Sequence, residues 1–104
     1  RIDVLPLTIG QTVSGNLTET NAALTYRLTL SSALNISLHG PQGVDFDIYV
    51  RKDTQPTTTE YDFRGYTSSA NEQVRIDPAS PGDYYIMIRS YRGQGSFTLT
   101  ASID

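Results

Sequence analysis

Two pairs of carboxylates have a spacing at which they could act together. Asp45 and Asp47 lie two positions apart, and Glu60 and Asp62 repeat that spacing. Residues two apart on an extended strand face the same side, about 7 Å from each other, and glycoside hydrolysis needs two carboxyl groups at a defined separation. However, a chain of 104 residues leaves little room for a substrate cleft, and nearby arginines could pair with either set. We therefore expect structural or solvated roles for these carboxylates.

The same carboxylates could hold a cation. Ca²⁺ takes about six to eight oxygen ligands from carboxylates, amides and carbonyls, and Asp45 and Asp47 would supply some of them. The sequence has no twelve-residue Asp-x-Asp-x-Asp-Gly calcium loop. Zinc is disfavoured because there is one histidine and no cysteine. We predict a domain that requires no cofactor, with Ca²⁺ at Asp45 and Asp47 as the metal to test.

Nucleophilic catalysis has little support in the sequence. It needs a base beside the nucleophile and a group that orients the base. The single histidine, His39, lies directly before Gly40-Pro41, and there is no Gly-x-Ser-x-Gly motif. We expect a surface or hydrogen-bonding role for His39, and a protein that is not an enzyme.

Tyrosine and arginine carry the strongest functional signal. Tyrosine offers a flat apolar face with a hydroxyl group, and arginine offers several hydrogen-bond donors. Several of these residues alternate with the apolar residues of two segments and so face away from the expected core. The predicted ligand-binding residues are Tyr49, Tyr85, Arg89 and Tyr91, with Tyr61 and Tyr66 at the rim. The alternative is that these side chains only cover the outer face of a sheet, and their exposure decides between the two interpretations.

Short segments of alternating polarity must position these side chains. Turn residues recur about every ten positions, between runs rich in Val, Ile, Leu, Thr and Tyr. The expected strands are 12–17, 24–31, 33–39, 45–52, 61–66, 72–76, 83–91 and 96–103. The expected core includes Phe46, Ile48, Val50, Tyr84, Ile86, Ile88, Phe97 and Leu99. This pattern predicts an all-β fold, an antiparallel β-sandwich of about eight strands that is jelly-roll-like.

Composition restricts the class of protein further. The length fits a single domain, 1–104, and 38% hydrophobic residues are enough for a packed core. A net charge of −3 argues against a nucleic-acid partner. No apolar run reaches the roughly 18 residues of a membrane span, so no membrane partner is expected. We expect a monomer.

Several stretches together resemble the bacterial pre-peptidase C-terminal domain family. They are Gly10-Gln11-Thr12-Val13-Ser14-Gly15-Asn16-Leu17, Tyr26-Arg27-Leu28, Asp45-Phe46-Asp47-Ile48-Tyr49-Val50, Gly82-Asp83-Tyr84-Tyr85-Ile86-Met87-Ile88 and Tyr91-x-Gly93-x-Gly95-x-Phe97-x-Leu99. The resemblance implies a jelly-roll-like sandwich appended to secreted proteases and other extracellular hydrolases. Related collagen-binding domains of clostridial collagenases use surface tyrosines, and calcium held partly by an N-terminal segment. Residues 1–8 here offer only Asp3 as a carboxylate.

We therefore expect a non-catalytic accessory module of a secreted, extracellular bacterial hydrolase. It would attach a linked catalytic domain to an insoluble polymer, either a polysaccharide or a collagen-like protein, through its tyrosine and arginine surface. The alternative is a secretion or processing appendage of a secreted protease, removed on maturation, that binds no ligand.

Overall fold

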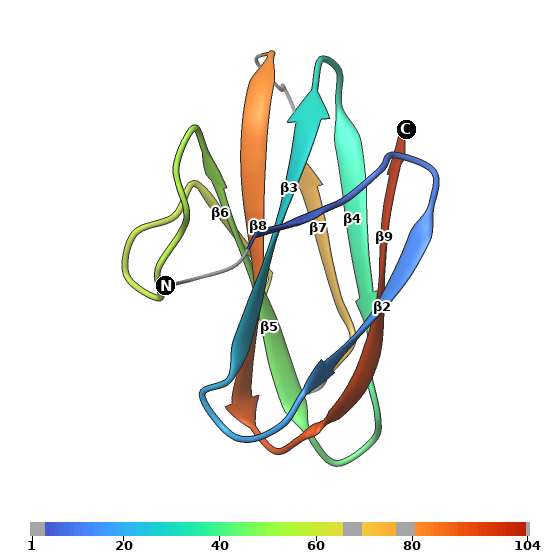
Figure 1. The fold of residues 1–104 in the computed structure, drawn as a ribbon, viewed down its shortest axis with the longest axis vertical. Helices are drawn as coiled ribbons and strands as arrows, with labels where there is room; N and C mark the ends of the chain where they lie inside the picture. The colour runs from blue at the N-terminus through green and yellow to red at the C-terminus, as the bar shows by residue number, and fades with distance from the viewer. Residues whose placement is uncertain (1–3, 66–69, 77–80, 104) are drawn as a thin grey trace.

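Two β-sheets packed face to face form the domain (Figure 1). The computed structural model describes residues 4–65, 70–76 and 81–103. Its strands are β1 (Val4–Pro6), β2 (Thr12–Leu17), β3 (Ala23–Leu30), β4 (Leu34–His39), β5 (Asp45–Lys52), β6 (Phe63–Gly65), β7 (Glu72–Ile76), β8 (Gly82–Arg92) and β9 (Gly95–Ile103). No helix that could cross a membrane occurs among the described residues.

The strand order confirms the predicted antiparallel sandwich. One sheet has the order β1-β3-β8-β5-β6 and the other β2-β9-β4-β7. Every adjacent pair is antiparallel except β1 with β3, which is parallel. Without β1, the four strands of each sheet have the arrangement of a jelly roll.

Alternating apolar residues fill the space between the sheets. Phe97 of β9 packs edge to face against Tyr26 and Phe46 of the opposite sheet, with ring centroids 6.5 and 6.3 Å apart. The eight predicted core residues are all buried. The core also includes Leu17, Leu28, Leu30, Leu34, Ile36, Leu38, Val74, Ile76 and Ala101. The period-two pattern therefore identified the inward faces of the strands correctly.

Strand β5 departs from the expected alternation. Its residues from Asp45 to Val50 are all buried, although Tyr49 was expected on the outer surface. Met87 of β8, which pairs with Tyr49, is only 9% exposed. The reason is local: β6 and the preceding loop, residues 53–62, lie beside β5 and bring Tyr61 and Arg64 over the Tyr49 ring.

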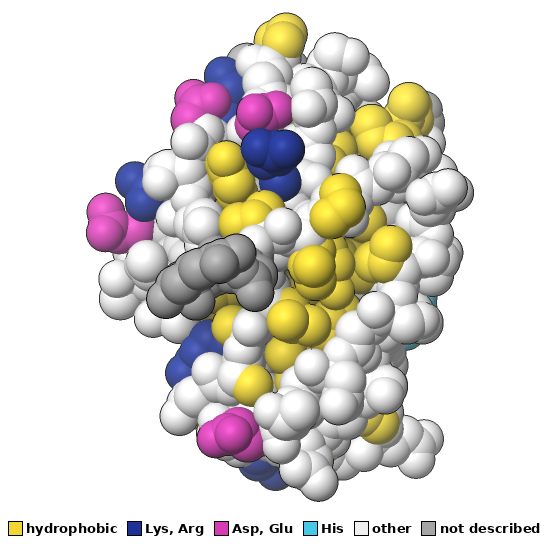
Figure 2. Space-filling model, in the orientation of Figure 1, with side chains coloured by type: hydrophobic (Ala, Val, Ile, Leu, Met, Phe, Trp, Pro, Cys, Tyr) yellow, Lys and Arg dark blue, Asp and Glu magenta, His cyan; other side chains and the backbone are white. Residues whose placement is uncertain are grey.

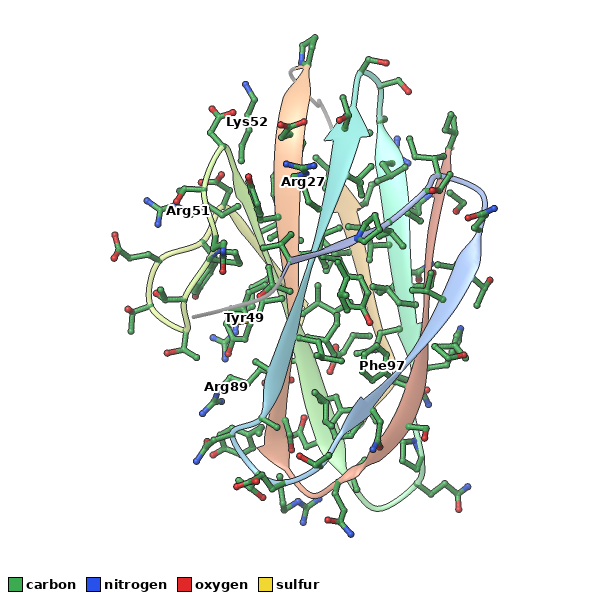
Figure 3. The ribbon with its side chains drawn as sticks, viewed as in Figure 1. Arg27, Tyr49, Arg51, Lys52, Arg89 and Phe97 are labelled. Atoms are coloured by element: carbon green, nitrogen blue, oxygen red, sulfur yellow. The ribbon has the colours of Figure 1, made fainter. Side chains whose placement is uncertain are left out.

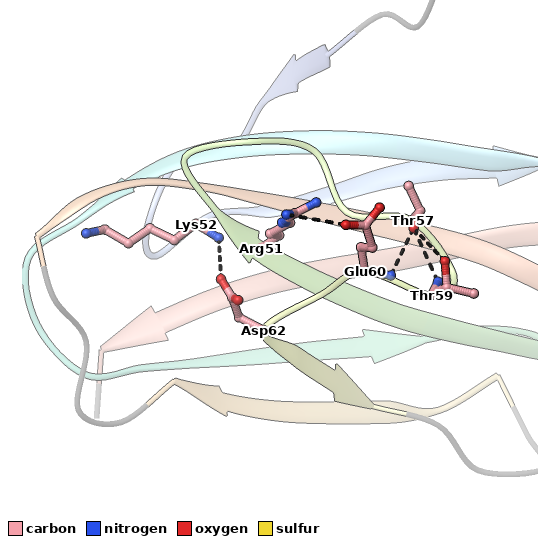
Figure 4. Close-up of polar contacts among 6 residues, drawn as sticks. All are labelled: Arg51, Lys52, Thr57, Thr59, Glu60 and Asp62. Carbon is pink, nitrogen blue, oxygen red and sulfur yellow. Dashed lines mark hydrogen bonds and ion pairs between the residues drawn. The ribbon is translucent and has the colours of Figure 1, made fainter.

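The loop before β6 is held to β5 by specific contacts (Figure 4). Asp62 Oδ2 accepts a hydrogen bond from the Lys52 backbone N–H at 2.8 Å, and Arg51 pairs with Glu60 at 3.8 Å. Within the loop, Thr57 Oγ1 accepts from the Glu60 N–H at 2.9 Å. These bonds shorten the strand predicted over 61–66 to Phe63–Gly65 among the described residues.

Candidate functional site

Arginines flank a tyrosine on the outer face of the five-stranded sheet. The register pairs Tyr85 of β8 with Arg27 of β3 on one side and with Arg51 of β5 on the other. The neighbours of Tyr85 along β8, Tyr84 and Ile86, are buried in the core. Tyr85 therefore points outward, where it is half-buried beside the exposed Arg27.

A groove of about 420 Å³ opens at this position. Strand β1 (Val4–Pro6) forms one wall, and Arg27, Gln55 and Tyr85 line the rest. Leu5 is 38% exposed there. Figure 2 shows hydrophobic and basic side chains next to each other on the face that it views. The groove thus combines apolar surface with arginine and amide donors, a combination typical of ligand sites.

Tyr49 lies beneath the side chains of Tyr61 and Arg64. Its ring centroid is 5.4 Å from that of Tyr61, and the Arg64 guanidinium lies 5.2 Å from the Tyr49 centroid. Tyr49 is only 2% exposed, so it cannot present a face to a polymer, whereas Tyr61 is 37% exposed. The predicted role of Tyr49 as a surface contact is therefore corrected to packing beneath Tyr61 and Arg64.

The other predicted tyrosine and arginine positions do not join into one platform. Arg89 donates to the Asn21 side-chain oxygen. Figure 3 shows Arg89 toward the opposite end of the sheet from Arg27. Tyr91 is 63% exposed but lies six residues along β8 from Tyr85, a strand distance of about 20 Å. Tyr66 lies outside the described residues.

A cluster of three acidic residues lies where the two sheets approach each other. Asp45 and Asp47 of β5 and Glu72 of β7 each bring a carboxylate oxygen within 4.8 Å of the others. Their exposed fractions are only 9%, 3% and 6%. The two predicted metal ligands are therefore together and buried. Glu72 was missed because nothing in the sequence indicates that β7 crosses behind β5.

The surroundings of this cluster favour the protonated form of Asp47. Burial, and then the neighbouring charges of Asp45 and Glu72, raise the pKa of Asp47 from 3.8 to about 7, while Arg64 acts in the opposite direction. Oδ1 of Asp45 and Oδ1 of Asp47 have no hydrogen-bond partner among the residues that the structure describes. Unpartnered buried carboxylate oxygens are costly unless a proton or a cation compensates them.

Glu72 also borders a second hollow, of about 600 Å³. Arg64 and Gly65 of β6 line one side, and Leu38 and His39 of β4 line another. Of the three cluster residues, Glu72 is the one that lines this hollow. His39 is exposed at its margin.

These features define a β-sandwich module with a surface groove and a buried carboxylate cluster. Residues 23–90 match the family described as bacterial pre-peptidase C-terminal domain. The chain belongs to this family, and it is a non-catalytic accessory module rather than an enzyme.

Similar proteins are mostly much longer proteases. The chain is 35% identical over 86 residues to the halolysin-like extracellular serine protease Nep of Natrialba magadii, which covers 77% of this chain and 16% of that protein. It is 36% identical over 77 residues to the neutral protease of Vibrio proteolyticus, covering 74% of this chain and 12% of that protein. The chain therefore spans less than a fifth of the length of either relative.

A solved structure shares the fold. The pre-peptidase C-terminal domain of a Bacillus anthracis collagenase superposes with a TM-score of 0.79 and 19% identity, covering 97% of this chain and 96% of that one. This similarity supports the jelly-roll assignment for the whole chain.

Proposed function

We propose that this domain is the accessory module of a secreted protease, and that its groove holds the linked catalytic domain on an insoluble protein polymer. The relatives that match this chain are proteases, two of them named extracellular. For a protease, the insoluble substrate is a protein, and one similar domain comes from a collagenase. A collagen-like chain is therefore the polymer we favour over a polysaccharide.

The groove beside Tyr85 is the observation that carries this proposal. Collagen-like chains are extended and rich in proline, and no backbone hydrogen bonds form within one chain, so the carbonyl groups not used between chains face solvent. Arg27 and Gln55 would donate to those carbonyls, while the Tyr85 ring and Leu5 would pack on proline rings. One contact of this kind is weak, but it raises the local concentration of substrate for a tethered enzyme.

Co-sedimentation of the 104-residue domain with insoluble polymers tests the proposal. The panel is fibrillar collagen, chitin, cellulose and agar, each with Ca²⁺ and with a chelator. We expect selective retention on collagen. The double variant Arg27→Ala/Tyr85→Ala should weaken retention about tenfold, as is common for aromatic and arginine anchors.

A matched control comes from the same strand. Tyr91→Ala removes a more exposed tyrosine outside the groove and should leave retention unchanged. Retention on chitin or cellulose alone would instead favour a polysaccharide ligand. Retention on no polymer would favour the processing appendage, and the intact mass of the mature parent protein would then show whether the domain had been removed.

A further inference from the structure

We propose that Asp45, Asp47 and Glu72 form a binding site for one Ca²⁺ ion between β5 and β7. This site is separate from the groove at Tyr85, and it does not depend on the proposed polymer binding. The ion would join the two sheets at a position where β5 belongs to one and β7 to the other.

The separations of the carboxylate oxygens fit a single coordination sphere. One oxygen from each residue lies within 4.8 Å of the other two. Oxygens bound to one Ca²⁺ at roughly 2.4 Å lie at most about 4.8 Å apart. The three carboxylates are therefore close enough to share one ion after small adjustments of their side chains.

A second observation comes from the buried oxygens without partners. All three side chains are at least nine-tenths buried. Oδ1 of Asp45 and Oδ1 of Asp47 receive no hydrogen bond from any described residue. In native proteins, most buried polar atoms have a partner. A cation bound to these oxygens would replace the hydration that they lost on burial.

The charge of the cluster fits a divalent ion. The cluster brings three carboxyl groups together, and the charge of Arg64 acts on Asp47 in the opposite direction to theirs. Carboxylate oxygens are hard ligands that select Ca²⁺, Mg²⁺ or Mn²⁺ over softer metals. Ca²⁺ completes its sphere readily with water and irregular geometry, which a site with three side chains requires.

Of the three side chains, Glu72 adjoins a space that water can occupy. Glu72 borders the hollow of about 600 Å³ that also contacts Arg64 and Asn71. Water in this hollow would provide the remaining ligands, since three carboxylates alone do not fill the sphere.

Thermal unfolding of the 104-residue domain, with isothermal titration of Ca²⁺, tests the site. At about 10 mM Ca²⁺, roughly tenfold above a weak extracellular-type Kd, the Tm should rise by about 5 °C or more over the value in chelator. Titration should give one ion per chain. Mg²⁺ at the same concentration should give a smaller shift.

Conservative variants show whether the rise in Tm comes from Ca²⁺ bound at this site or from a general effect of the ion on the protein. Asp47→Asn keeps the shape of the side chain and removes a repulsive charge, so it should fold, yet lose the Ca²⁺-dependent rise in Tm. Glu72→Gln should do the same. Asp53→Asn is the matched control, because Asp53 is exposed with φ of 71°, a conformation that asparagine also accepts.

The proposal fails if the Tm is the same in Ca²⁺ and in chelator. It also fails if Asp47→Asn and Glu72→Gln both keep the full Ca²⁺ response, because the ion would then bind elsewhere. A response lost in these two variants and kept in Asp53→Asn supports it.

Discussion

Arg64 connects the aromatic layer to the buried carboxylates. Its guanidinium lies 5.2 Å from the Tyr49 ring centroid and 5.8 Å from that of Tyr61, and its charge opposes the upward pKa shift of Asp47. A single side chain thus contributes both cation–π contacts and local charge balance. Removal of Arg64 would affect packing and electrostatics together, so it is a poor probe of either alone.

The raised pKa of Asp47 predicts a particular pH dependence when Ca²⁺ is absent. In the unfolded chain the pKa is 3.8, and burial raises it to about 7 in the fold. Between these values the folded state binds a proton that the unfolded chain has released. This contribution to stability is complete below pH 3.8 and is lost as the pH rises through about 7.

Urea unfolding in chelator at about pH 5 and about pH 8 measures this effect. The free energy of unfolding should fall by on the order of 1–3 kcal/mol between them, through this carboxyl group. Asp47→Asn should lose that part of the pH dependence, because asparagine does not titrate. An identical fall in the variant would contradict the assignment to Asp47.

At the scale of elements, β2 is held by close contact between its backbone and the core. A Cβ on Gly15 would lie 2.5 Å from Phe97 Cζ and 2.8 Å from the Tyr26 hydroxyl oxygen. Both neighbours are buried, and their rings already pack against each other. The strand can approach the opposite sheet here only because Gly15 has no side chain.

Gly15→Ala should therefore destabilise the domain by about 1–3 kcal/mol, the usual cost of overpacking. Chemical denaturation measures the change in unfolding free energy. Ser14→Ala, on the exposed side of the same strand, should change it by less than about 0.5 kcal/mol. Equal effects of the two substitutions would show that the contact with Phe97 does not prevent a side chain at position 15.

Most strands were predictable because a half-buried strand alternates apolar and polar residues with a period of two. The segments 12–17, 45–52 and 72–76 coincide with β2, β5 and β7. Strand β1 was missed because Val4-Leu5-Pro6 is too short for alternation and contains a proline, and only its parallel pairing with β3 makes it a strand. The burial of both faces of β5 depends on a loop whose path the sequence does not specify.

At the scale of the molecule, the domain measures 35 × 28 × 21 Å. The groove is lined by β1, Arg27, Gln55 and Tyr85, and the carboxylate cluster is formed by β5 and β7. The two share no residue, so a ligand and an ion could bind independently. This separation suits an attachment module, because binding of polymer need not disturb the core.

Tethering makes a prediction for a protease fused to this domain. Hydrolysis of fibrillar collagen should be several-fold faster with the domain than without it, since attachment raises the effective substrate concentration. Hydrolysis of a short soluble peptide should be equal for the two proteins. The fusion that carries Arg27→Ala/Tyr85→Ala should match the protease without the domain. Equal rates on fibrils for all three proteins would argue against attachment.

The sequence by itself determined which faces of the strands are apolar, and therefore the sandwich and its core. Its motifs also resembled those of the family that residues 23–90 match. It also placed Asp45 and Asp47 on one side of one strand, because side chains alternate with a period of two. Only the tertiary structure brought Glu72 to them, buried Tyr49 under Tyr61 and Arg64, and set Tyr85 beside Arg27 in a groove. Alternation decides on which side of its strand a side chain lies. The packing of strands distant in sequence decides what lies next to it.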